Sequence, residues 1–214
     1  MSEPDSTIRT LVDDLTPVGR PPDVSRYSAT WWLLALIATG GVMALIAPFR
    51  PGVIDQLIAS PRFAFESILG LVVTAGIARA AFGLGIPDVR SQWRRARVAL
   101  VLLAIWLALF GIATVAPVLE PSMLGKRPLC NLEVLLYAVP LTVAGIIVIR
   151  RMMPLDPAKT GAWMGFAAGL IPAWLMQIAC MHEPWHIIKF HLAPTIGAAL
   201  LGALLGYWLL RRKS

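Results

Sequence analysis

The stretch CMHEPWHIIKFHLAP, residues 180–194, joins the apolar run Ala162–Ala179 to the apolar run Leu192–Leu210. It gathers one thiol, three imidazoles and one carboxylate within 15 residues, whereas the runs on either side are almost free of charge. Each run has close to the ~20 residues that an α-helix needs to cross the hydrocarbon core of a bilayer. We therefore expect two membrane-spanning helices, with a reactive connection between them at one membrane surface.

The composition of the whole chain agrees with a membrane protein. Of its 214 residues, 57% are hydrophobic and only 14% are charged, and the mean hydropathy is +0.72. A soluble domain has about a quarter of its residues charged, and it could not bury this much apolar surface. The net charge of +7 comes from short basic clusters at the ends of apolar runs, which is typical of membrane orientation and does not indicate nucleic-acid binding.

Six apolar runs divide the chain, and each is long enough to cross a membrane as a helix. The sequence therefore predicts an all-α membrane protein built as a bundle of six transmembrane helices. The runs are Thr30–Pro48, Phe63–Phe82, Val98–Val118, Leu132–Ile149, Ala162–Ala179 and Leu192–Leu210.

The basic residues predict the orientation of this bundle. With the N-terminus inside, 14 of the 19 Lys and Arg residues lie on the cytoplasmic side and 5 lie outside. Both termini are then cytoplasmic, and the outer connections are residues 49–62, 119–131 and 181–191. The expected parts are a tail of residues 1–29, a membrane domain of residues 30–210 and a basic C-terminal cap of residues 211–214.

The two cysteines, Cys130 and Cys180, fall at the outer ends of the fourth and fifth runs, so this topology places both thiols on one side. They could form a disulfide, bind a metal ion together or be inert packing residues. His182 and His186 are four residues apart and would share a helix face, although Pro184 between them favours a loop or a helix start. His191 is a further candidate ligand or an interfacial residue. Thiolates with imidazoles would select soft or borderline ions such as copper, zinc or cadmium.

Other polar residues at membrane depth are few. Glu66, Glu133 and Gln177 lie near the outer ends of their runs, and we expect them to line one vestibule with the cysteines. No continuous acidic or histidine relay crosses the middle of the membrane. No nucleotide-binding loop and no nucleophile motif is present, so we expect no enzyme activity.

Glycines recur in the last two runs. Gly161, Gly165 and Gly169 are spaced four apart, as are Gly202 and Gly206, with Gly197 before them. Such faces of small residues let helices pack closely in lipid. We expect packing within the bundle rather than a dimer seam, and the oligomeric state stays open.

The polar tail contains one amphipathic segment. Its apolar positions follow the i, i+3, i+4, i+7 spacing of a helix face, and two aspartates occupy the other side. The apolar face is Ile8, Leu11, Val12 and Leu15, and the aspartates are Asp13 and Asp14. A helix this short is marginal alone, so it folds on a partner or on the membrane, unless the pattern is chance in an unstructured leader. The acidic character favours a partner protein, because helices that bind membrane surfaces are usually basic.

Three features resemble the NrsF family of membrane-bound negative regulators of sigma factors. They are the tail sequence IRTLVDDLTPV at residues 8–18, the cysteine that opens the fourth run, and Cys180 followed by Phe190-His191-x-x-Pro194. The resemblance covers essentially the whole chain. It implies six spans, a tail that holds an extracytoplasmic-function sigma factor at the bacterial inner membrane, and release under heavy-metal or oxidant stress sensed by Cys130 and Cys180.

We therefore expect an anti-sigma factor whose outer cysteines control a cytoplasmic tail. It needs no resident cofactor, although a heavy-metal ion could bind transiently at Cys130 and Cys180, and the opposite polarity of the signal stays open. The alternative is a membrane redox or haem- or metal-binding protein that uses His182, His186 and His191. A small transporter is a third possibility, but it would require internal repeats and charges at mid-membrane depth.

Overall fold

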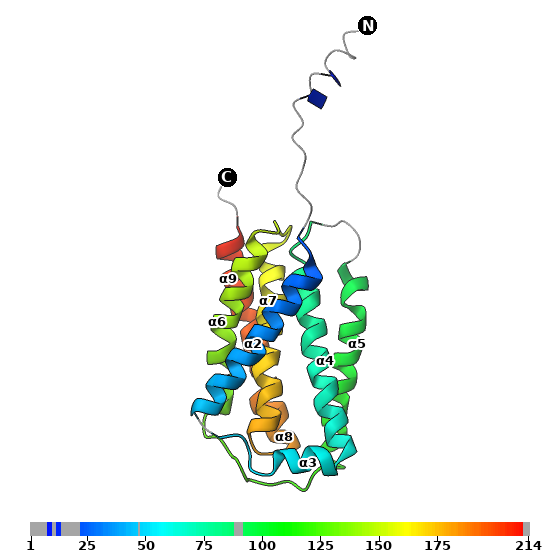
Figure 1. The fold of residues 1–214 in the computed structure, drawn as a ribbon, viewed down its shortest axis with the longest axis vertical. Coiled ribbons are helices and arrows are strands. Elements are labelled where there is room, and N and C mark those ends of the chain that lie inside the picture. The colour runs from blue at the N-terminus through cyan, green and yellow to red at the C-terminus, as the bar shows by residue number, and fades with distance from the viewer. Residues whose placement is uncertain (1–7, 10–11, 14–21, 47, 88–91, 212–214) are drawn as a thin grey trace.

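The chain folds as a bundle of long helices, seen in a computed structural model that describes residues 8–9, 12–13, 22–46, 48–87 and 92–211. Within these ranges the regular structure is entirely helical, which confirms the predicted fold class (Figure 1). Six helices are long and apolar enough to cross a membrane, the last being the continuous segment Pro184–Leu210. The elements are α2 Val24–Ile46, α3 Val53–Ala59, α4 Pro61–Gly83, α5 Gln92–Ala113, α6 Cys130–Arg150, α7 Pro157–Ala179, α8 Pro184–His186, the π-helix η1 Ile187–Leu192 and α9 Pro194–Leu210.

Helix ends differ from the predicted ones where a capping residue or a proline decides them. Helix α2 begins six residues before the predicted Thr30, because the Asp23 carboxylate accepts hydrogen bonds from the backbone N–H groups of Ser25 (2.9 Å) and Arg26 (3.2 Å). Asp156 caps α7 in the same way, through the backbone N–H of Lys159 at 3.0 Å. Helix α5 ends at Ala113, well before the predicted Val118, since the residue before Pro117 disfavours helical backbone.

The last span differs most from its prediction. It begins at Pro184, where the Glu183 side chain accepts hydrogen bonds from the backbone N–H groups of Trp185 and His186. Most of the predicted outer loop 181–191 is therefore helical. Of the two alternatives that Pro184 left open, a loop or a helix start, the structure has the helix start, because proline is tolerated at the first helical position, where the missing N–H costs nothing.

Helix α7 lies at the centre of the bundle and packs against α2, α4, α6 and α9 (Figure 1). Its contact with α9 is close because glycines face one another. A Cβ added at Gly161 would lie 2.6 Å from the Cα of Gly206, and one added at Gly165 would lie 2.9 Å from the Cα of Gly202. The predicted packing of small residues within the bundle is therefore present, except that Gly197 faces Leu135 of α6.

Tryptophan side chains join the remaining helices. The indole N–H of Trp174 on α7 donates to the carbonyl of Ser67 on α4 at 2.7 Å, and that of Trp106 on α5 donates to the carbonyl of Glu66 at 3.0 Å. Trp31 on α2 donates to the carbonyl of Leu141 on α6 at 3.3 Å. These bonds fix helices for which lipid provides no hydrophobic driving force to associate.

The first residues of α2 and the last residues of α9 lie at the same end of the bundle (Figure 1). The cysteines lie at the opposite end. In the tail, Ile8, Arg9, Val12 and Asp13 have helical backbone and exposed side chains. The other predicted contact residues, Leu11, Asp14 and Leu15, lie outside the described residues.

The substitution Gly165→Ala tests the α7–α9 contact. The new methyl group has no room against the α9 backbone, so we expect a loss of about 1–3 kcal/mol in the free energy of unfolding. Thermal unfolding of the purified protein in detergent measures it. Gly111→Ala is the matched control, because nothing lies within 4 Å of its added Cβ and alanine is the better helix former. Equal midpoints for the two variants would contradict the close packing.

Candidate metal centre

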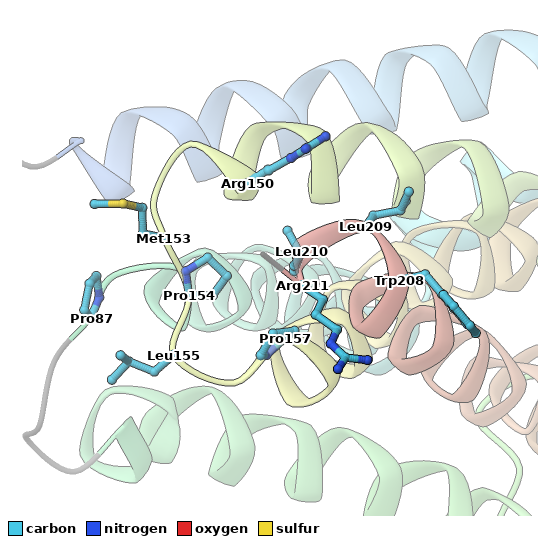
Figure 2. Close-up of a pocket in the computed structure, with 10 residues that line it drawn as sticks. All are labelled: Pro87, Arg150, Met153, Pro154, Leu155, Pro157, Trp208, Leu209, Leu210 and Arg211. Atoms are coloured by element: carbon cyan, nitrogen blue, oxygen red, sulfur yellow. The ribbon is translucent and has the colours of Figure 1, made fainter. Parts of the chain in front are cut away.

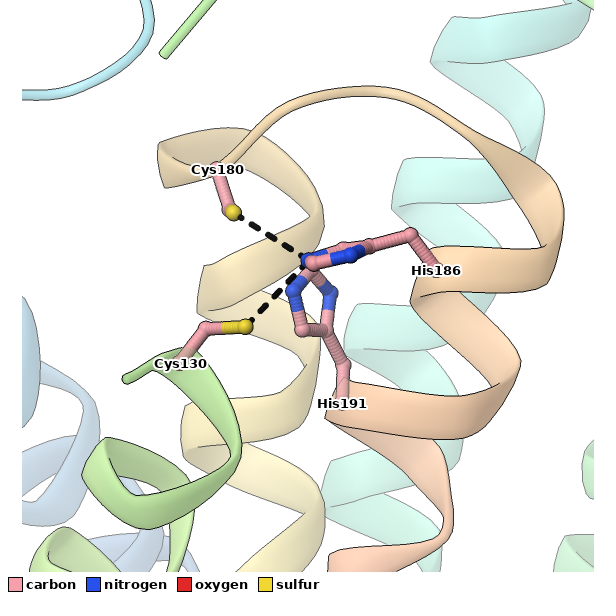
Figure 3. A group of neighbouring side chains, drawn as sticks. All are labelled: Cys130, Cys180, His186 and His191. Carbon is pink, nitrogen blue, oxygen red and sulfur yellow. Dashed lines mark hydrogen bonds between the residues drawn. The ribbon is translucent and has the colours of Figure 1, made fainter. Parts of the chain in front are cut away.

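Two thiols and two imidazoles meet (Figure 3) at the end of the bundle opposite to the one where α2 begins and α9 ends (Figure 1). Their ligand atoms, one each from Cys130, Cys180, His186 and His191, all lie within 4.8 Å of one another. We call these four residues the Cys/His cluster. Both cysteines are free thiols and are buried, as is His191, and only His186 is partly exposed. The cluster thus unites the two cysteines that the topology predicted to share one side.

Helix ends present the two thiols. Cys130 is the first residue of α6, and Cys180 directly follows the last residue of α7. Cys180 has extended backbone, with φ −103° and ψ 176°, and its N–H still donates to the carbonyl of Met176 at 2.9 Å. The chain therefore leaves α7 at Cys180 and turns its thiol toward Cys130 and the histidines (Figure 3).

A π-helical turn brings the two imidazoles together. His186 and His191 are five residues apart, and in an α-helix this spacing would place them about 140° apart around the axis. The π-helix η1 has the wider i to i+5 pattern, and the N–H of Ala193 donates to the carbonyl of Ile188 at 2.9 Å. The two rings consequently meet edge to face, with centroids 5.0 Å apart. Short π-helical turns inside α-helices are frequent at functional sites.

Pro194 gives a physical reason for this turn. In a regular α-helix the N–H of residue 194 would bond to the carbonyl of Phe190. Proline has no N–H, and its ring would clash with that carbonyl, so the helix cannot keep α-helical geometry there. The wider turn ends where α9 begins at Pro194. This signal is present in the sequence. Of the three histidines named as possible ligands, His186 and His191 meet in the cluster, whereas the spacing of four between His182 and His186 does not bring those two together.

The distances within the cluster suit a tetrahedral metal ion. The Nε2 atom of His186 lies 3.2 Å from the Sγ of Cys130 and 3.6 Å from the Sγ of Cys180. A tetrahedral zinc ion, with bonds of about 2.3 Å to sulfur and 2.0–2.1 Å to nitrogen, would separate its ligand atoms by roughly 3.4–3.8 Å. The nitrogens of His191 are buried and have no hydrogen-bond partner among the described residues. The four donors could therefore hold an ion with small shifts.

The environment of Cys180 favours its thiolate. The neighbouring Cys130 thiol acts as a hydrogen-bond donor and lowers the pKa of Cys180, whereas burial acts in the opposite direction. The thiolate is the form of cysteine that binds metal ions and reacts with oxidants.

His182 is not part of the cluster, contrary to its prediction as a possible ligand. It is 2% exposed and packs edge-on against Phe63, with ring centroids 5.1 Å apart. Burial, followed by the nearby charges of Arg50 and His191, lowers its pKa to about 4, so the ring is neutral at pH 7. In the described parts of the chain neither ring nitrogen has a hydrogen-bond partner.

The carboxylates predicted to line a vestibule form ion pairs with arginines. Glu133 lies 2.7 Å from Arg127, and Glu66 lies 3.3 Å from Arg62. The Gln177 amide is buried, and no described residue hydrogen-bonds to it. None of the three belongs to the Cys/His cluster.

A pocket of about 1030 Å³ lies at the opposite end of the bundle (Figure 2). It combines two arginines with apolar side chains, and its lining is Pro87, Arg150, Met153, Pro154, Leu155, Pro157, Trp208, Leu209, Leu210 and Arg211. These residues include the last of α6, the first of α7 and the last of α9. The same three helical segments carry the Cys/His cluster at or next to their other ends.

Comparison with known proteins identifies the family. No curated protein and no solved structure matches the chain. A family model described as negative regulator of sigma F matches residues 11–211, which is nearly the whole chain and includes the cluster and all six long helices. The chain therefore belongs to the NrsF family, the negative regulators of sigma F.

Proposed function

We propose that this protein holds its sigma factor at the membrane through the N-terminal tail and releases it when a thiophilic metal ion binds the Cys/His cluster. Family membership gives a negative regulator with a sigma factor as its partner. The observation that carries the sensing part of the proposal is the convergence of four ligand atoms within 4.8 Å. The resemblance of the tail and the cysteine positions supports a sigma factor of the extracytoplasmic-function type.

The donor set favours particular ions. Two thiolates and two imidazoles suit zinc, cadmium or copper(I), whereas magnesium and calcium prefer oxygen ligands. A divalent ion with two thiolates carries no net charge, so the buried cluster can hold it without a large desolvation cost. No enzymatic step and no resident cofactor is part of this proposal, because the ion is the signal.

Three helices connect the cluster to the opposite end of the bundle. Cys130 begins α6, Cys180 follows α7, and His186 and His191 precede α9, so an ion that draws these residues together acts on three helices at once. Their far ends line the pocket that contains Arg150 and Arg211. A small shift at the cluster would therefore change this surface, which lies at the end of the bundle where α2 begins (Figure 1).

The energies involved are sufficient. A change of occupancy from 99:1 to 1:99 requires about 5.5 kcal/mol of differential binding. Structural zinc sites provide apparent binding energies of about 10–16 kcal/mol, of which a fraction is enough to shift a packed bundle.

The tail provides a helix face for the sigma factor. Ile8 and Val12 are each 57% exposed and lie four residues apart in the sequence, which is the spacing of one helix face. Leu11 and Leu15 extend this face in the sequence, and Asp13 and Asp14 would meet basic residues of the partner. Helices of this kind bind in apolar grooves.

The distribution of basic residues supports an orientation with the tail in the bacterial cytoplasm and the cluster in the periplasm. In this arrangement the cluster faces the compartment through which external metal ions enter. That compartment also permits thiol oxidation, and the two thiols are close enough that an oxidant could join them after a small movement. Oxidation is the second candidate signal.

Cadmium titration of the purified protein tests the metal site. We expect one tightly bound Cd²⁺ per chain, measured by sulfur-to-cadmium charge-transfer absorbance. The variants Cys130→Ser, Cys180→Ser and His191→Gln should each lower the cadmium affinity by roughly 100-fold or more. Loss of a residue that only hydrogen-bonds to a metal ligand already lowers metal affinity by about 10–100-fold.

His182→Phe is the matched control for this titration. Phenylalanine keeps the packing against Phe63, and no hydrogen bond from a described residue is lost because neither imidazole nitrogen has such a partner. We expect unchanged cadmium affinity and unchanged or higher thermal stability. A loss of cadmium binding in this variant would make His182 a ligand and contradict the site.

Charge placed on the tail face tests the sigma contact. The double substitution Ile8→Asp/Val12→Asp should weaken capture of a co-expressed sigma factor by roughly 30-fold or more, as expected for at least 2 kcal/mol lost at an interface centre. Arg9→Ala, on the neighbouring side of the segment, should retain capture. The measurement is co-purification from detergent, and equal capture by both variants would exclude this face.

Release by the signal is tested in the same co-purification. Cadmium should displace the sigma factor from the wild-type protein but not from a Cys130→Ser/Cys180→Ser variant, whose capture should equal that of the untreated wild type. A mild oxidant serves as a parallel arm and separates the two candidate signals. Normal release from the double variant would rule out the cysteines as sensors.

A further inference from the structure

A buried arginine lies directly against the Cys/His cluster. Arg50, in the segment between α2 and α3, is 3% exposed, and its Nη1 donates to the backbone carbonyl of Cys180 at 3.3 Å. Arginine is almost never fully buried unless it is paired. Yet within the described ranges no carboxylate forms an ion pair with Arg50. The two ion pairs near this end join Arg62 to Glu66 and Arg127 to Glu133.

Helix α4 and the connection before α6 hold Arg50 in place. Its guanidinium lies over the ring of Phe63 on α4, 5.5 Å from the centroid, and the same ring packs against His182. Gly125, in the connection between α5 and α6, lies next to the Arg50 stem, and its φ of +79° suits glycine. A Cβ at Gly125 would lie 3.0 Å from both Cβ and Cγ of Arg50, so the missing side chain makes room for the arginine stem.

The hydrogen bond from Arg50 fixes the backbone where the chain leaves α7. The last carbonyls of a helix have no partner within the helix, and an arginine can satisfy them and complement the helix dipole. The carbonyl carbon of Cys180 is bonded directly to the Cα that carries the thiol side chain. A hydrogen bond that holds this carbonyl therefore restricts the backbone orientation of Cys180. The direction of the Cys180 thiol toward Cys130 and His186 follows from this orientation.

We propose that Arg50 is a positioning residue of the Cys/His cluster, which holds the Cys180 carbonyl so that the thiol is directed at the bound ion. This inference rests on the proposed metal site. It assigns a role to a residue that would not itself bind the ion. Positioning partners of this kind typically contribute 10–100-fold to metal affinity.

Cadmium affinity of full-length variants tests this role, with a competing chelator to measure tight binding. Arg50→Met keeps much of the side-chain length but removes every donor, and should weaken Cd²⁺ binding by roughly 10–100-fold. Arg50→Lys keeps a donor and the charge, and should restore affinity to within about fivefold of the wild type, which is a smaller loss than the roughly 10–100-fold that a lost positioning partner costs. Lys126→Met, which removes an exposed positive charge at the same end of the bundle, is the control and should bind as the wild type does.

The absorbance per bound cadmium separates positioning from a general loss of structure. Its charge-transfer intensity counts sulfur ligands, so it should fall in Arg50→Met, where Cys180 no longer reaches the ion, while the thermal midpoint of the metal-free protein changes little. Arg50→Gln, which is shorter and uncharged, is the second variant and should behave as Arg50→Met does.

Wild-type affinity and absorbance in both variants would overturn the inference. So would a loss of the folded state in both variants without metal, since Arg50 would then support the bundle in general. A wild-type protein that binds no cadmium would instead overturn the proposed metal site, and the role of Arg50 with it.

Discussion

The close packing of α7 against α9 is the contact on which the rest of this structure depends. Glycines at Gly161, Gly165, Gly202 and Gly206 allow the two backbones to approach, and in lipid this packing replaces the hydrophobic force that joins helices in water. It fixes the end of α7, which precedes Cys180, against the helix that begins after His191. The cluster thus lies where two helices turn back on each other, with glycines at the closest points of their seam.

The bundle keeps its chemistry at its ends and its middle apolar. One end holds two thiols and two imidazoles, all buried except the partly exposed His186, and the other holds a pocket with two arginines. Three helical segments run from one end to the other. Since packed helices can shift as rigid elements, a change at the cluster would, under the proposed function, be carried along their length.

Much of this architecture could be predicted from the sequence, because apolar length decides which segments are helices that can span a membrane. The shared position of Cys130 and Cys180 followed from counting spans. The histidine pair could not be predicted from α-helical spacing, since Pro194 imposes a different turn. Arg50 was also missed as a functional residue, because an arginine outside an apolar run counts only as an orientation signal until the fold shows that it is buried beside Cys180.

The π-helical turn has an evolutionary consequence. A π-turn amounts to one extra residue in an α-helix, and here that residue rotates His191 toward the thiols while Leu192 and the helix beyond keep their path through the membrane. Inserting or deleting a single codon between His186 and His191 would thus add or remove an imidazole donor without altering any ligand residue. Under the proposed sensing function, the length of one turn would thus decide how many donors the ion meets, with the same cysteines and histidines in the gene.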